Sequence, residues 1–135
     1  MAAQLSVAVR NARLDAIETT IGTLPIMRIR SGAQPANCAA AFTGTVLATL
    51  NLPSDWMSAA ASGTKSLLGT WTDASADAGG TAGHFQICDA AGTTCHWQGT
   101  VTATGGGGDL TVDNVVFAAN QAFTVTIFSA TDANA

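Results

Sequence analysis

The sequence contains few charged residues and no long apolar run. Only 10% of its 135 residues are Asp, Glu, Lys or Arg, whereas about 25% is typical of soluble domains. No apolar stretch approaches the roughly 18 residues that a membrane-spanning helix needs, and a hydrophobic content of 47% excludes intrinsic disorder. A surface rich in Thr, Ser, Asn and Ala is easily desolvated and suits protein contact. A compositional bias of the genome would explain the same surface equally well.

Basic residues are nearly absent after the first 30 positions. Before that point lie four arginines, at Arg10, Arg13, Arg28 and Arg30. The first 30 residues carry a net charge of +2, and residues 31–135 carry −6 with Lys65 as their only basic residue. Such an acidic chain is a poor candidate for nucleic-acid binding. The four arginines are candidate contacts to an acidic partner, although solvated surface charge is the more common role of exposed arginines.

Recognisable catalytic and metal-binding motifs are also absent. The three cysteines include no CxxC pair of the kind typical of zinc sites, and no nucleophile elbow, HExxH motif or phosphate-binding loop occurs. Asp109 and Asp113 would lie about 13 Å apart in one strand, too far for a pair of glycosidase carboxylates. The sequence therefore predicts no catalytic residue, no metal site and no cofactor, and we expect a protein that is not an enzyme.

The amino terminus lacks the features of a secretory signal peptide. Its apolar segment, residues 5–9, is too short for a signal core, Arg10 interrupts it, and no basic segment precedes it. We therefore expect a protein that is made and kept in a cytoplasm, with its cysteines reduced.

One amphipathic helix is expected at residues 4–21. Apolar residues recur there at spacings of three and four: Leu5, Val9, Ala12 and Ala16, extended by Leu14, Ile17 and Ile21. Gly22 is well placed to end the helix, and Pro25 prevents its continuation. The first turn is open to a second interpretation, because Val7 and Val9 fit a strand equally well.

From residue 24 to residue 130 the pattern predicts β-structure. Seven short strands are expected, at residues 26–30, 45–50, 66–72, 84–89, 94–104, 109–117 and 122–128, separated by loops rich in Gly, Ala, Ser and Asn. This pattern predicts one domain over residues 1–135. Its fold class is mainly β, an antiparallel β-sandwich of jelly-roll type with one N-terminal helix.

The hairpin near residue 90 allows a more detailed prediction. If Phe85 pairs with Trp97 and Ile87 with Cys95, a three-residue loop with glycine at its left-handed position joins the strands. Cys88 then points to the opposite face from Cys95. We therefore predict no disulfide between Cys88 and Cys95.

The glycine run and the tryptophans complete the candidates. Residues 105–108 are expected to form a hairpin loop, mobile unless a partner holds it, because four glycines are costly to order. Trp71 and Trp97 alternate with core positions and are expected to be buried. Trp56 follows a turn and is the candidate for an exposed, partner-binding aromatic, and its alternative role is to cap one end of the sandwich.

Three segments of the chain resemble a protein family. They are QLSVAVRNARLDAIE at residues 4–18, ATLNLPSDWM at residues 48–57, and the glycine-rich residues 102–112. Together they are similar to the capsid cement, or decoration, proteins of tailed bacteriophages, such as those of short-tailed Bordetella phages. The resemblance implies a jelly-roll sandwich that sits as a dimer on the outside of an icosahedral shell built from the major capsid protein. It assigns no role to individual residues.

Combined with the residue patterns, the resemblance leads to a functional expectation. We expect a virion protein whose partners are the major capsid protein and a second copy of itself, with no nucleic acid and no membrane. The candidate contacts are Arg10, Arg13, Arg28, Arg30 and Trp56, together with the helix and the loops at residues 31–41 and 73–83. A tail-associated or glycan-binding β-sandwich module is the alternative, and a small hydrolase is the weakest interpretation because no nucleophile–base pair can be named.

Overall fold

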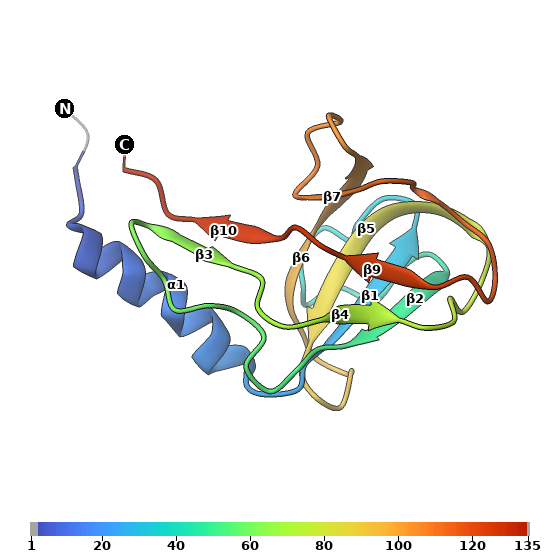
Figure 1. Ribbon diagram of the computed structural model, residues 1–135, viewed down its shortest axis with the longest axis horizontal. Helices are drawn as coiled ribbons and strands as arrows, with labels where there is room; N and C mark the ends of the chain where they lie inside the picture. Colours follow the sequence, from blue (N-terminus) through green and yellow to red (C-terminus); the bar gives the residue numbers. More distant parts are fainter. Residues whose placement is uncertain (1–2, 135) are drawn as a thin grey trace.

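A computed structural model of the chain, which describes residues 3–134, consists mainly of β-strands with one helix at the amino terminus (Figure 1). Helix α1 spans Val7–Ile21, so it begins three residues later than predicted. Ser6 has extended backbone geometry, and its side chain accepts a hydrogen bond from the N–H of Val9, which is the usual arrangement of an N-cap. Gly22, with a φ of 92°, ends the helix as expected.

The larger sheet has the strand order β2-β1-β5-β6-β7. Its strands are β1 (Ile26–Ser31), β2 (Val46–Asn51), β5 (Gly80–Cys88), β6 (Cys95–Ala103) and β7 (Leu110–Val112), and β8 (Val116–Phe117) pairs with the first residues of β5. Side chains alternate between two faces, so that Met27 and Ile29 of β1 face the core while Arg28 faces the other side.

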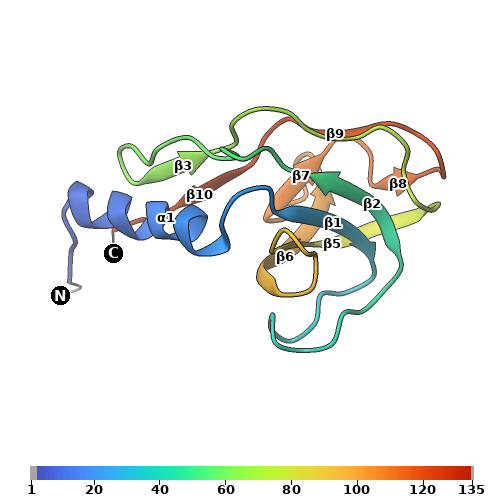
Figure 2. The ribbon, with the colours of Figure 1, turned by 90° about the horizontal axis from the view of Figure 1, so that it is seen from below.

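A long two-stranded ribbon forms the second layer. It contains β3 (Thr64–Ser66) paired with β10 (Ser129–Thr131), and β4 (Trp71–Asp73) paired with β9 (Phe123–Val125), all antiparallel. The N–H of Leu67 donates to the carbonyl of Phe128 at 2.9 Å and connects the two pairs. Residues 64–73 and 123–131 thus run side by side, and we call this pair of segments the ribbon. One end of the ribbon lies over the large sheet, and the other extends past it to meet α1 (Figures 1 and 2).

The core lies between the large sheet and the ribbon. Phe128 of the ribbon packs against Trp71, Phe85 and Trp97, with ring centroids 4.8–5.4 Å apart. Trp71 is fully buried, as predicted, and Trp97 is half-buried against the same cluster. The mainly β fold with one N-terminal helix is confirmed, and the two layers are consistent with a β-sandwich. The jelly-roll strand order stays a prediction. No helix in residues 3–134 is long and apolar enough to cross a bilayer.

The glycine run joins two parallel strands instead of the predicted hairpin. β6 and β7 are parallel, with Val101 opposite Leu110, although parallel neighbours usually need a much longer connection. The run can close this short path because it folds back directly over Thr102. A Cβ atom at Gly108 would lie 2.8–2.9 Å from atoms of Thr102. The Thr102 hydroxyl accepts a hydrogen bond from the N–H of Gly108, which holds the returning chain.

The pairing of β5 with β6 also differs from the prediction. Phe85 lies opposite Gly99, Ile87 opposite Trp97, and Cys88 opposite Cys95. The register shifts between Ile87 and Cys88, which reveals a bulge that the alternating sequence pattern cannot indicate. The predicted absence of a Cys88–Cys95 disulfide is confirmed, but the reason given for it is wrong. The two residues are paired, Cys88 is a buried free thiol, and Cys95 is bonded elsewhere.

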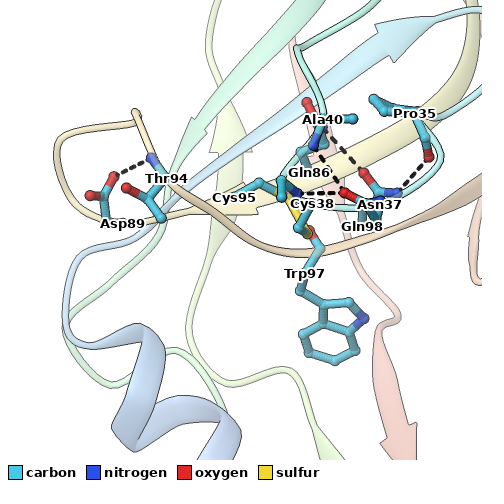
Figure 3. Close-up of a disulfide and its surroundings, with 11 residues drawn as sticks. Pro35, Asn37, Cys38, Ala40, Gln86, Asp89, Thr94, Cys95, Trp97 and Gln98 are labelled. Carbon is cyan, nitrogen blue, oxygen red and sulfur yellow. Dashed lines mark hydrogen bonds between the residues drawn. A yellow bond between two sulfur atoms is a disulfide. The ribbon is translucent and has the colours of Figure 1, made fainter.

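Cys95 forms a disulfide with Cys38 (Figure 3). The expectation of reduced cysteines is therefore wrong for this pair. The bond fixes the loop between β1 and β2 against β6, and Gln98 of β6 donates a further hydrogen bond to the carbonyl of Pro35 at 2.7 Å. This loop covers the outer face of the large sheet, where His84 is completely buried.

Candidate binding surface

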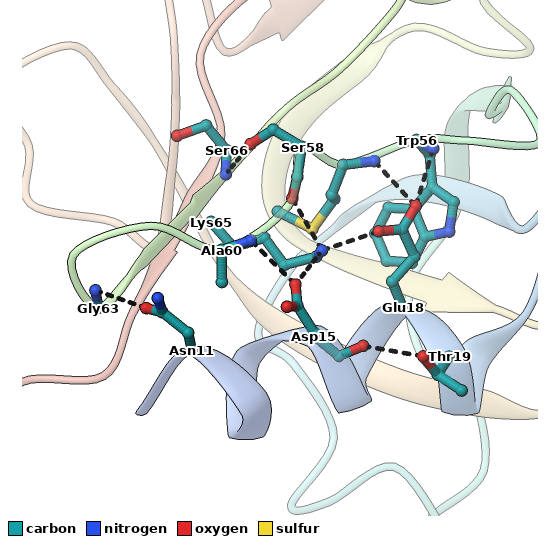
Figure 4. A network of polar contacts seen from close by, with 11 residues as sticks. Asn11, Asp15, Glu18, Thr19, Trp56, Ser58, Ala60, Gly63, Lys65 and Ser66 are labelled. Carbon is teal, nitrogen blue, oxygen red and sulfur yellow. Dashed lines mark hydrogen bonds and ion pairs between the residues drawn. The ribbon is translucent and has the colours of Figure 1, made fainter. Parts of the chain in front are cut away.

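The polar side of α1 faces the protein's own interior. These side chains accept hydrogen bonds from backbone N–H groups of residues 56–63 at 2.9–3.2 Å: Asn11 from Gly63, Asp15 from Ala60, and Glu18 from Trp56 and Met57 (Figure 4). The chain preceding β3 therefore has its backbone donors satisfied by the helix. This arrangement determines which side of α1 turns inward.

Lys65 of β3 completes the contact between helix and ribbon. Its side chain is only 2% exposed, and its ammonium group contacts Asp15 Oδ1 at 2.9 Å, Glu18 Oε2 at 2.8 Å and the carbonyl of Ser58 at 2.8 Å. Three acceptors match the three protons of an ammonium group. Burial alone would lower the pKa of Lys65, but the hydrogen bonds and charges of Glu18 and Asp15 outweigh it and raise the pKa.

The contact with Lys65 also changes the pKa of the Asp15 carboxylate. The hydrogen bond from Lys65, followed by the one from the Ala60 N–H, lowers the pKa of Asp15. Helix and ribbon are thus joined by a charged, fully bonded contact. The signal for it was present in the sequence, because Lys65 is the only basic residue after Arg30.

The opposite side of α1 is apolar and faces solvent. On the helix, Val9 is 45% exposed and Ala12 and Ala16 are exposed beside it, and Leu5, two residues before the helix begins, is 37% exposed. We call these four residues the outer stripe. A typical surface helix turns its apolar side inward. In α1 only Leu14 and Ile21 are buried, and the residues of the outer stripe are not.

A shallow hollow of about 300 Å³ borders the outer stripe. Its lining consists of Arg13, Ala16, Ile17, Thr20 and Ile21 of α1 and His96 of β6. The floor is apolar, and the side chains of Arg13 and His96 border it. Arg13 is 61% exposed and forms an ion pair with Asp132 at 3.2 Å. The hollow extends the apolar surface from the helix toward the β5–β6 hairpin.

The four candidate arginines fall into two separate pairs. Arg10 donates to the carbonyl of Asp132 at 3.0 Å and lies near Arg13 on α1. On β1, Arg28 donates to the carbonyl of Gly92 at 2.7 Å, and the nearly buried Arg30 lies over the Phe42 ring at 4.9 Å from its centroid. The structure therefore does not bring the four together, and Arg13 is the one whose side chain borders the outer stripe.

Trp56 is completely buried, so the prediction of an exposed aromatic is wrong. Its indole N–H donates to the carbonyl of Gly22 at 3.0 Å, and its ring centroid lies 5.9 Å from that of Trp71. The turn before it suggested exposure, but Glu18 binds the backbone N–H of Trp56 and the ring packs beneath the end of α1. The alternative role, capping one end of the core, fits this position.

A larger open hollow lies on the other flank of α1, with a volume of about 480 Å³. Asp15, Glu18 and Asp55 contribute carboxylates to its lining, but the first two are already bound to Lys65. Within residues 3–134, no group of three or more His, Cys, Asp or Glu side chains is placed to hold a metal ion.

Comparison of the chain with protein-family models, with curated proteins and with solved structures gave no match.

Proposed function

We propose that this chain is a decoration, or cement, protein of a tailed bacteriophage. It is made in the host cytoplasm and binds the outer surface of the icosahedral capsid as a homodimer, where it stabilises the lattice of the major capsid protein. The observation that carries the proposal is the outer stripe, an apolar helix surface without an intramolecular partner among the described residues. It lies within one of the three segments on which the family resemblance is based.

The chemistry of the outer stripe fits contact with another protein. Ala12 and Ala16 are small, so a second surface can approach the helix backbone closely, while Leu5 and Val9 supply apolar area. The inward-facing polar side chains Asn11, Asp15 and Glu18 of α1 are already bound to Lys65 and to the backbone of residues 56–63. Docking on this side therefore desolvates few polar groups, which keeps its cost low.

Stabilisation of a capsid follows from mass action. A protein that binds the assembled lattice and not the separated subunits shifts the equilibrium toward assembly. A dimer contacts the lattice at two points, so each contact can be weak while the combined binding is strong. The candidate contact loops at residues 31–41 and 73–83 would add to the surface that α1 provides.

The test is a binding measurement with capsid shells and a charged outer stripe. In the double variant Ala12→Glu and Ala16→Glu, two carboxylates enter the apolar surface, and we expect at least about a tenfold loss of affinity for shells of the major capsid protein. Glutamate is a good helix former, so α1 should persist. The matched control, Ala119→Glu, changes an exposed alanine outside α1 and outside both candidate contact loops, and it should bind as the wild type does. Equal binding by all three proteins would contradict the proposal.

Copy number distinguishes this function from the alternative of a tail-associated or glycan-binding module. A decoration protein is expected at hundreds of copies per virion, whereas a tail protein is expected at a handful. An exposed Trp56 would have supported glycan binding, but Trp56 is buried. No other observation favours that alternative. Quantitative gel densitometry of purified virions measures the copy number, and absence of the protein from virions would contradict both functions.

A further inference from the structure

Strand β10 forms an open edge of the ribbon. Among residues 3–134 its one strand partner is β3 (Figure 1). The carbonyl of Phe128 accepts from Leu67, and the N–H of Asp132 donates to the carbonyl of Gly63, so both residues direct their backbone groups toward β3. Because these directions alternate along a strand, the backbone groups of Ser129 and Thr131 in β10 point away from β3 toward the open edge, and Ile127 lies just before this strand.

This edge lacks the features that prevent strand association. Exposed edges are usually protected by lysine, by proline or by a charged side chain. Residues 114–131 contain no charged residue and no proline. Ile127 is 72% exposed, the highest value among the large hydrophobic side chains described. The edge therefore offers backbone donors, backbone acceptors and an apolar side chain together.

We propose that this edge pairs with the same edge of a second copy of the chain, antiparallel and about a two-fold axis at Ser129. Self-pairing brings the same short segment of both copies together, so a charge close to the axis would lie near the like charge of the second copy. This edge carries none, which favours a second copy over a partner selected by opposite charge. With Ser129 on the axis, Ser129 exchanges backbone hydrogen bonds with its own counterpart, and Ile127 lies opposite Thr131 of the second copy.

The pairing joins two ribbons into one continuous sheet. A two-fold axis at an antiparallel strand pair runs perpendicular to the sheet, so both copies keep the same face on the same side. Helix α1 packs on one face of the ribbon (Figure 2), and the outer stripe faces away from it. The dimer would therefore present both outer stripes in one direction, as attachment to a single shell surface requires.

The interface is short, and its strength follows from its size. Stable interfaces bury about 800 Å² per partner, which is more than an edge of a few residues provides. We expect a dimer that dissociates on dilution, with a dissociation constant on the order of micromolar or weaker. Dense binding to a shell would raise the local concentration and favour the pair.

Cysteine cross-linking tests the position of the axis. Residues in a hydrogen-bonded antiparallel pair have Cα atoms about 5.5 Å apart, which is within reach of a disulfide. Under mild oxidation, Ser129→Cys should give a covalent dimer on non-reducing gels. The matched control is Ser66→Cys, because Ser66 lies directly opposite Ser129 but on β3, one strand away from the edge. Equal cross-linking of the two variants, or none in either, would overturn the assignment.

Sedimentation of the protein in solution provides the second measurement. Ile127→Lys places a charge on the edge and should weaken dimerisation about tenfold or more. Val116→Lys makes the same change at another exposed position, on β8, and should leave it unchanged. A wild type that is monomeric at every concentration would overturn the inference.

The inference rests on the homodimer of the proposed function, but the two can fail separately. A dimer of this geometry that does not bind shells would contradict the function alone. Shell binding that is unaffected by Ile127→Lys, with no Ser129→Cys cross-link, would contradict the dimer alone.

Discussion

At the scale of single residues, the ammonium group of Lys65 connects α1 to the ribbon through Asp15 and Glu18. Lys65→Met keeps the length of the side chain but leaves two carboxylates facing each other without a counter-charge. Breaking a buried ion pair on one side costs about 3–5 kcal/mol. Because Asp15 is 46% exposed, water will screen part of this effect, and we expect a loss of about 2–3 kcal/mol in the free energy of unfolding.

Urea denaturation measures this loss. The control places Lys65→Met in a background of Asp15→Asn and Glu18→Gln, where no carboxylate is left unpaired and the additional loss should be smaller. A loss below about 1 kcal/mol for the single variant would mean that the ion pairs do not hold α1 in place.

Asp109 provides a residue-scale prediction for pH. Its carboxylate accepts hydrogen bonds from the N–H and the hydroxyl of Thr100, both at 2.9 Å, and these lower its pKa. A carboxyl whose pKa is lower in the folded state contributes stability above its unfolded pKa, and this contribution is lost as the pH falls through the folded value. We therefore expect Asp109→Asn to be less stable than the wild type at pH 7, with the difference shrinking below about pH 4.

Thermal unfolding at pH 7 and pH 3 measures that difference. Asp113→Asn is the control, because it removes a nearby exposed aspartate that makes no side-chain hydrogen bond within the described residues. A difference for Asp109→Asn that is the same at both pH values would contradict the role assigned to its hydrogen bonds.

Single residues also show what the sequence could predict. The burial of Trp71 followed from alternation within its strand, which is a local signal. The burial of Trp56 depends on Glu18, 38 positions earlier in the chain, and no local pattern contains that contact. The Cys38–Cys95 disulfide could not be predicted from a local pattern either, because its two cysteines are 57 positions apart.

At the scale of elements, α1 was predicted with the correct end, but its orientation was not predicted. Its apolar periodicity identified the stripe without saying which side is covered, and Lys65 and the backbone donors of residues 56–63 draw the polar side inward. Periodicity identifies the faces of a helix, and long-range partners decide which face is covered. For the same reason the sequence indicated the candidate binding helix, but the exposed position of the outer stripe required the structure.

The short connection between β6 and β7 gives an element-scale prediction. Gly108→Ala would place a methyl group against both side-chain and backbone atoms of Thr102 at 2.8–2.9 Å. Such overpacking typically costs about 1–3 kcal/mol. The control is Gly107→Asn, because Gly107 has open space around it and a φ of +79° that asparagine tolerates better than most residues.

Thermal unfolding of the two variants tests whether the glycine run is needed for close approach. We expect Gly108→Ala to unfold at a clearly lower temperature than Gly107→Asn. If both variants unfold at the wild-type temperature, the close approach of Gly108 to Thr102 is not needed for stability.

At the scale of the whole molecule, two candidate contact surfaces lie outside the core. The outer stripe faces away from the ribbon, and the open edge of β10 lies at the margin of the same ribbon. Both belong to the part of the molecule that extends beyond the large sheet (Figures 1 and 2). The large sheet and its disulfide can therefore provide stability while this extension provides contacts. That division suits a protein whose function is to present a surface.

The Cys38–Cys95 disulfide should account for a large share of the stability of the whole chain. It closes a loop of 57 residues, and a cross-link of this span is expected to contribute about 2–4 kcal/mol, chiefly by restricting the unfolded chain. Cys38→Ser should therefore unfold at a much lower urea concentration than the oxidised wild type, and reduction should bring the wild type close to the variant. Cys88→Ala is the control, because Cys88 is a free thiol and its replacement leaves the cross-link intact.

Alkylation under denaturing conditions checks the pairing, since the oxidised wild type should expose one thiol and the reduced protein three. The opposite result would be three reactive thiols in protein that was never reduced, together with an unfolding transition that does not respond to a reductant. It would show that the loop between β1 and β2 is held only by hydrogen bonds such as that of Gln98 to Pro35.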